Sequence, residues 1–268
     1  MPRRSRAALA AILLATVVPA ALSAQDRQSE KTWTLNEQVP AGKWLRVRNV
    51  NGEVHVRAST TDRVEIVATK SWRRGDPKMV RIESRKAPDG SILVCAFWTE
   101  NATCTESGYR SNSEGRNNRD NDVAVDFEVR LPKGVNLGAW SVNGEVSVDG
   151  ATGEVEAGSV NGSVDATSSG GPVQASSVNG SVHARMGRAT GDGDLDFSTV
   201  NGSVIAEFAE DIDANIELST VNGRFQTDWP VTITGRVDPR HLRATLGKGG
   251  RRVRLSTVNG NVELRKRG

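Results

Sequence analysis

The sequence predicts an all-β protein, a repeat β-solenoid with 18–22 residues in each coil. Val-Asn-Gly occurs seven times, and after Asn143 the intervals between asparagines are 18, 18, 22, 21 and 37 residues. A period of about 20 residues is typical of repeats that bury their apolar faces against neighbouring units. Abundant glycine (27 residues) and few aromatic residues (4%) suit thin, regularly turning β-structure. We predict a structural role for the Asn-Gly corners: Asn51, Gly52, Asn143, Gly144, Asn161, Gly162, Asn179, Gly180, Asn201, Gly202, Asn222, Gly223, Asn259 and Gly260.

The seven copies share more than the tripeptide. Around Asn161, for example, Val155 and Ala157 precede it by six and four residues, and Val164 follows it by three. These three positions are apolar in every copy, whereas the residue after the glycine is always polar. Since alternate residues of a strand share one face, each unit is predicted as a strand, a Ser/Thr-Val-Asn-Gly corner and a second strand.

The corner allows three interpretations. Asn-Gly between apolar residues favours a two-residue hairpin, but such a loop would pair the valine with the polar residue after glycine. An antiparallel meander or sandwich with four-residue loops remains the alternative. We favour the solenoid, in which the valine stacks on its equivalents in a core, and in which Asn and Gly allow a left-handed backbone conformation at the corner.

The N-terminus predicts export. Three arginines precede an apolar run from Ala7 to Leu22, and small residues follow it, which is typical of a cleaved signal peptide at 1–24. Cleavage fits after Ser23 or after Ala24, and an uncleaved anchor is the alternative. We expect an extracytoplasmic protein without a transmembrane segment after removal of the signal, and periplasm, cell surface and medium stay open as destinations.

The rest of the chain divides into three predicted regions. A polar lead segment spans 25–43, an N-terminal β region spans 44–136, and the repeat solenoid spans 137–268. Within the second region, the almost wholly polar stretch 105–122 is predicted as a long mobile loop.

The two cysteines, Cys95 and Cys104, are predicted to form a disulfide. An even pair in an exported chain is usually oxidised. Two thiols without a nearby histidine are too few for structural zinc.

The charge argues against nucleic acid as a partner. The chain has 35 Lys+Arg and 32 Asp+Glu, and three arginines lie in the predicted signal, so the mature chain is formally neutral. Residues 141–235 are acidic, whereas 236–268 are basic. Anionic envelope components are therefore a hypothetical partner for Arg251, Arg252 and Arg254.

The C-terminal part predicts a capped end of the solenoid. The unit between Asn222 and Asn259 lacks the motif and is interpreted as a degenerate coil. Arg265, Lys266 and Arg267 are expected to protect an open sheet edge after the last strand. Insertions fall in the corner opposite Asn-Gly, at 186–194 and 208–215, where a binding surface is expected to vary.

Candidate chemistry is sparse. Asp192, Asp194 and Asp196 alternate and carry oxygen ligands suited to calcium, but a second set of ligands is not evident, so no metal or other cofactor is expected. The histidines are scattered without a triad spacing. Convergence of Asp165, Asp196 and Arg185 on one face would favour a carbohydrate-active solenoid enzyme, a lyase or hydrolase.

Several segments together resemble a known family. These are the repeated Ser/Thr-Val-Asn-Gly-x-Val coils, the strand ending in Leu-Pro-Lys-Gly at 131–134, the segment 193–202 and the ending 239–260. Over residues 40 to 268 they are similar to a bacterial family of exported adhesin-like proteins, a domain of unknown function. The resemblance implies an extracytoplasmic, β-solenoid-like, non-enzymatic protein, and it supplies no catalytic residues.

Two functions follow as hypotheses. The first is a non-catalytic binding or scaffolding module at the cell envelope, with an unknown protein or glycan ligand. The second is the carbohydrate-active enzyme. Regular Ser/Thr and Asn ladders with dispersed charge would favour the module, whereas close carboxylates with an Arg or Lys in a concave patch would favour the enzyme.

Overall fold

The computed structural model describes residues 31–111, 121–187, 193–209, 212–231, 238 and 240–267, with the backbone of residues 27 and 28. The predicted signal peptide lies outside these residues, as do parts of both insertion corners, at 188–192 and 210–211.

The described chain is built from strands and one short 3-10 turn. Their bounds are β1 Arg27–Gln28, β2 Thr32–Gln38, β3 Trp44–Arg48, β4 Val54–Ala58, β5 Arg63–Ser71, η1 Pro77–Met79, β6 Arg81–Lys86, β7 Ile92–Phe97, β8 Ala102–Thr105, β9 Gly108–Ser111, β10 Ala124–Leu131, β11 Asn136–Asn143, β12 Val146–Ala151, β13 Val155–Asn161, β14 Val164–Ser168, β15 Val173–Ser176, β16 Val182–Met186, β17 Leu195–Ser198, β18 Val204–Phe208, β19 Ala214–Asn222, β20 Phe225–Thr227, β21 His241–Leu246, β22 Arg251–Asn259 and β23 Val262–Lys266.

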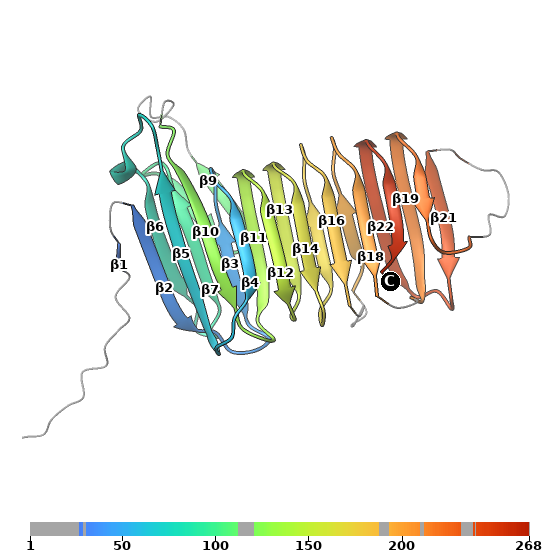
Figure 1. Cartoon of the computed structure of the whole chain (residues 1–268), viewed down its shortest axis with the longest axis horizontal. Helices are drawn as coiled ribbons and strands as arrows, with labels where there is room; N and C mark the ends of the chain where they lie inside the picture. Colours follow the sequence, from blue (N-terminus) through green and yellow to red (C-terminus); the bar gives the residue numbers. More distant parts are fainter. Residues whose placement is uncertain are drawn as a thin grey trace, which may run out of the picture.

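The fold is a flattened, elongated β-solenoid, which confirms the predicted class (Figure 1). Sheet A has 11 strands, in the order β1-β2-β5-β10-β4-β12-β14-β16-β18-β23-β20. Sheet B has 10 strands, in the order β21-β19-β22-β17-β15-β13-β11-β3-β7-β6. Each coil runs along sheet B, turns at the Asn-Gly corner and returns along sheet A.

Equivalent repeat positions stack in register and form the core. Val164 pairs with Val146 and Val182 on its two sides, and Val155 pairs with Leu137 and Val173. All of these side chains are at most 1% exposed. The apolar rows of the two sheets therefore meet in one continuous interior, as the two-residue alternation predicted.

The two sheets extend further toward the N-terminus than expected. Strand β2 occupies much of the predicted polar lead, 25–43, and Trp33 of β2 is fully buried. The boundary expected at 136/137 is not a break either, because Leu137 of β11 pairs with Leu45 of β3. The first Val-Asn-Gly copy, at Asn51, has the same spacing as the later ones, so its coil stacks directly against theirs.

A disulfide-linked hairpin covers the outer face of β7. Cys95 of β7 is bonded to Cys104 of β8, as predicted. A mobile loop was expected over residues 105–122, but β9 lies within this stretch and pairs with β8, which ends at its first residue. Residues 112–120 lie outside the described residues. Phe97 and Tyr109 pack at 6.0 Å between ring centres in the small cluster under the hairpin. Strand β7 is thus buried on both faces, which explains its unbroken apolar sequence.

The coils do not follow chain order at the C-terminal end. The last coil, β22 and β23, lies between the coil of β17 and β18 and the coil of β19 and β20 (Figure 1). The segment 222–259, interpreted as a degenerate coil, contributes β20 and the antiparallel edge strand β21. The prediction that Arg265, Lys266 and Arg267 protect an open edge is therefore wrong, because β23 pairs with β18 and β20 on its two sides.

Candidate functional site

The corner valines lie on the outer surface. Their exposed fractions are 39% for Val160, 40% for Val178, Val200 and Val258, and 49% for Val221. The prediction that they belong to a stacked core is therefore wrong. The preceding Ser or Thr takes the interior position instead; Ser159, for example, is only 7% exposed.

The buried hydroxyls explain this choice. Ser159 Oγ donates to the carbonyl oxygen of Gly144 in the preceding coil at 2.8 Å. The same bond recurs in five other coils: Ser141 to Gly52, Ser177 to Gly162, Thr199 to Gly180, Thr257 to Gly202 and Thr220 to Gly260. Each hydroxyl satisfies a glycine carbonyl at the corner, and a valine in its place would leave that carbonyl without this donor.

The asparagines form a hydrogen-bonded ladder along the same edge. Asn179 Nδ2 donates to Asn161 Oδ1 at 2.8 Å. Four further pairs repeat the bond in the same direction: Asn161 to Asn143, Asn201 to Asn179, Asn259 to Asn201 and Asn222 to Asn259. Among the described residues only glycines have positive φ, so the corner asparagines do not use the left-handed conformation that the residue type allows. The amide ladder gives the asparagine its structural role.

Together these residues make a regular surface, which we name the corner face. It consists of Val160, Val178, Val200, Val258 and Val221 with the asparagines that follow them. Adjacent rungs are strand neighbours, about 4.8 Å apart. Because the amides are tied to one another and β-branched valines are stiff, the face is ordered before it meets any partner.

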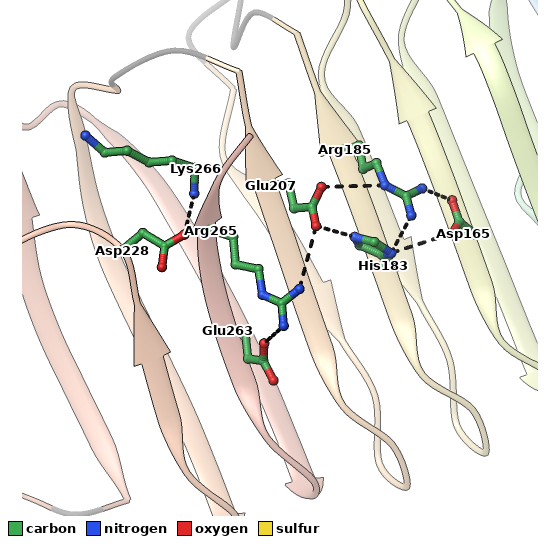
Figure 2. A network of polar contacts seen from close by, with 8 residues as sticks. All are labelled: Asp165, His183, Arg185, Glu207, Asp228, Glu263, Arg265 and Lys266. Carbon is green, nitrogen blue, oxygen red and sulfur yellow. Dashed lines mark hydrogen bonds and ion pairs between the residues drawn. The ribbon is translucent and has the colours of Figure 1, made fainter. Parts of the chain in front are cut away.

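A second polar group lies on the outer face of sheet A (Figure 2). Arg185 of β16 contacts Asp165 of β14 at 2.6 Å and Glu207 of β18 at 3.6 Å. His183 lies 2.9 Å from Glu207 and 3.6 Å from Asp165. Arg265 of β23 extends the network to Glu207 at 3.9 Å. Because Asp165 and Glu207 each contact cations, the network has the character of a charge-paired strand surface.

Of the three residues proposed for an enzyme, only two converge. Asp165 and Arg185 share sheet A, whereas Asp196 lies on β17 of sheet B. Asp196 contacts Arg254 at 4.0 Å and lines a shallow groove of about 340 Å³ beside Trp140. Of the possible calcium ligands, Asp192 lies outside the described residues. Within the part that the structure describes, no three His, Cys, Asp or Glu side chains are placed to hold a metal ion.

A buried arginine on sheet B was missed by the sequence reasoning. Arg48 is 8% exposed, and its guanidinium carbon lies 3.4 Å from the centre of the Trp140 ring. Its Nη2 donates to the carbonyl oxygen of Glu106 in the β8–β9 turn. Burial, and then the charge of Arg46, lower the pKa of Arg48 to about 10. The sequence did contain a signal for this contact at the position three residues before each corner Asn. The first two copies have Arg48 and Trp140 there, whereas the later copies have Gly or Ser.

Several cations of the basic C-terminal region form ion pairs. Glu217 of β19 accepts a hydrogen bond from Arg252 at 2.6 Å and one from Arg243 at 3.3 Å, and His241 Nε2 lies 3.3 Å from it. The hydrogen bond from Arg252 is the main cause of a lowered pKa of Glu217. Arg254 likewise contacts a carboxylate, that of Asp196. Two of the arginines proposed to bind anionic envelope components, Arg252 and Arg254, thus already contact carboxylates of the chain.

This arrangement predicts an acid-sensitive cap. A carboxyl group whose folded pKa is lowered stabilises the fold fully above its ordinary pKa, about 4.3 for Glu, and the stabilisation is lost as pH falls through the folded value. Glu217→Gln removes the ion pairs at every pH. We therefore expect the difference in unfolding free energy between wild type and Glu217→Gln, from urea titrations, to be large at neutral pH and to vanish once the pH lies well below the ordinary pKa of Glu. An equal difference at both pH values would contradict the assignment.

A sequence profile of the Toastrack DUF4097 family matches residues 38–265. The chain belongs to this family. The match spans both sheets and all seven corners, so the Toastrack domain includes the N-terminal β region as well as the later coils.

Two solved structures are similar to this Toastrack chain. A candidate cell adhesion protein from Clostridium sporogenes is 12% identical, with a TM-score of 0.44, and the alignment covers 88% of this chain and all of that one. A candidate adhesin from Bacteroides fragilis is 13% identical, with a TM-score of 0.30 and coverage of 89% and 98%. No curated protein matches the sequence. Among the described residues, no helix is long and apolar enough to cross a bilayer.

Proposed function

We propose that this Toastrack chain is an exported, non-catalytic binding or scaffolding module at the bacterial cell envelope. The observation that carries the proposal is the corner face, which differs from the insertion corners opposite Asn-Gly, where the sequence led us to expect the binding surface. Its valines are exposed in every coil from Val160 onward, although no contact of the core requires an apolar side chain at an outward position. A row of apolar groups beside a fixed amide ladder supplies both contact area and hydrogen-bonding groups to a protein or glycan.

The remaining features agree with this role. The ladders are regular, and the carboxylates of the sheet A network are already paired with cations. The distribution of charge therefore favours the module over the hydrolase or lyase. The Cys95–Cys104 disulfide is typical of exported proteins and supports an extracytoplasmic location, as does the signal-like N-terminus.

Binding to isolated bacterial envelopes tests the proposal. We expect Val178→Asp with Val200→Asp to weaken binding at least about tenfold, because two charges would interrupt the apolar row. Both side chains are 40% exposed, so the fold should persist. Val67→Asp is the matched control, since Val67 is 42% exposed but lies on β5, away from the corners. Equal binding by all variants would remove the corner face from the proposal.

A glycan array with a turnover assay on every hit tests the absence of catalysis. The expected result is retention without release of reducing sugar. Release of reducing sugar from any hit would replace the module with the carbohydrate-active enzyme.

A further inference from the structure

The arginines of the two ends differ in their pairing. At the C-terminal end, Arg243 and Arg252 share Glu217, and Arg265 contacts Glu263. Near the N-terminal end, Arg46 of β3 and Arg85 of β6 form no ion pair with any residue that the structure describes. Positive charge without a contacting carboxylate is therefore also found at the end where the sequence did not suggest it, although the charge of Glu154 acts on Arg46 from a longer distance.

These two arginines line one cavity of about 220 Å³. It lies between β3, the β6–β7 pair and the β8–β9 turn, so the disulfide-linked hairpin forms one of its walls. Leu93 and the ring of Trp44 provide an apolar part of the lining, and Thr105 provides a hydroxyl group. The cavity therefore combines cationic, hydroxyl and apolar groups within a small volume.

The guanidinium of Arg46 is held in place before any ligand arrives. Its central carbon lies 4.0 Å from the centre of the Trp44 ring, which fixes the guanidinium against an aromatic face. Its Nε is buried and finds no hydrogen-bond acceptor among the described residues. Arg48 is a third cation nearby, and it anchors the Glu106 carbonyl of the cavity wall. A buried donor without a partner and concentrated positive charge both point to an anionic ligand.

We propose that this cavity binds the carboxylate group of a small organic acid, no larger than one sugar or amino acid unit. Guanidinium groups match a planar carboxylate through paired hydrogen bonds. The apolar lining fits the carbon body, and the Glu106 side chain opposes a multiply charged anion such as phosphate. The volume lies below the about 300 Å³ at which drug-sized sites begin. The inference rests on the binding role proposed above, for which it names a ligand chemistry.

Calorimetric titration with glucuronate and with N-acetylalanine tests the proposal and separates a sugar acid from an amino acid source. At least one of them is expected to bind, whereas glucose and inorganic phosphate are not. Arg46→Gln and Arg85→Gln should each weaken binding about tenfold or more, since each removes a charge-assisted hydrogen bond. Arg57→Gln, an exposed arginine of sheet A without an ion pair to any described residue, should not change it. Arg85 is exposed, so its substitution leaves the fold intact.

The possible results separate the two proposals. No binding of either carboxylate, equal or tighter binding of phosphate, or affinity unchanged in Arg46→Gln and Arg85→Gln would overturn the carboxylate cavity. In those cases envelope binding that depends on Val178 and Val200 would still support the module. Carboxylate binding without any envelope binding would instead sustain the cavity and overturn the proposed function.

Discussion

Leu264→Ala is expected to lower the free energy of unfolding by about 3 kcal/mol, because it leaves a cavity in the apolar interior between the two sheets. Leu264 lies four residues before the end of the sequence, yet it is fully buried. It pairs with Ala206 of β18 on one side and Thr227 of β20 on the other. Urea unfolding followed by circular dichroism measures the loss.

The same substitution on a true edge strand is the control. Leu242 lies on β21, which has a neighbour on one side only, and it is half-buried. Leu242→Ala should cost less than half as much, because its surroundings are partly solvent before the change. If the two substitutions cost the same, β23 would not be an internal strand.

Gly180→Ala is expected to destabilise the chain by about 2–3 kcal/mol through overpacking between coils. A Cβ atom at Gly180 would lie 2.2 Å from the carbonyl oxygen of Gly162 in the adjacent coil. The backbone φ of Gly180 is not positive, so the expected loss comes from the close approach of the two coils and not from a left-handed conformation. The loss of stability would be measured as a fall in the midpoints of thermal and urea unfolding.

Gly193→Ala provides the comparison, because a Cβ atom at Gly193 would meet no atom of the described residues within 4 Å. We expect that substitution to be neutral within about 0.5 kcal/mol. Equal midpoints for Gly180→Ala and wild type would mean that the coils separate readily at the corner, and the stacking explanation of the glycines would then be wrong.

Most of the candidate site was visible in the sequence only as a pattern. At the outward position three residues before each corner Asn, Trp140 differs from the glycine and serines of the later copies. Its contact with Arg48 depends on the pairing of β3 with β11, which are 88 residues or more apart in the chain. The cavity of Arg46 and Arg85 likewise needs β6, β7 and the hairpin to be placed beside β3. Contacts between distant segments carry no local periodicity, so residue patterns do not predict them.

The sequence by itself determined the all-β class, the coil length, the core rows and the disulfide, because each depends on local alternation, spacing or composition. Tertiary structure decided the order of the last coils. The coils of Asn222 and Asn259 have the same apolar spacing, so either fits against the coil of Asn201 in the same register, and only the whole assembly places Asn259 there. It also decided which corner side chain turns inward. A buried serine or threonine hydroxyl donates a hydrogen bond to the glycine carbonyl of the adjacent coil, so the valine faces solvent, where it forms the corner face.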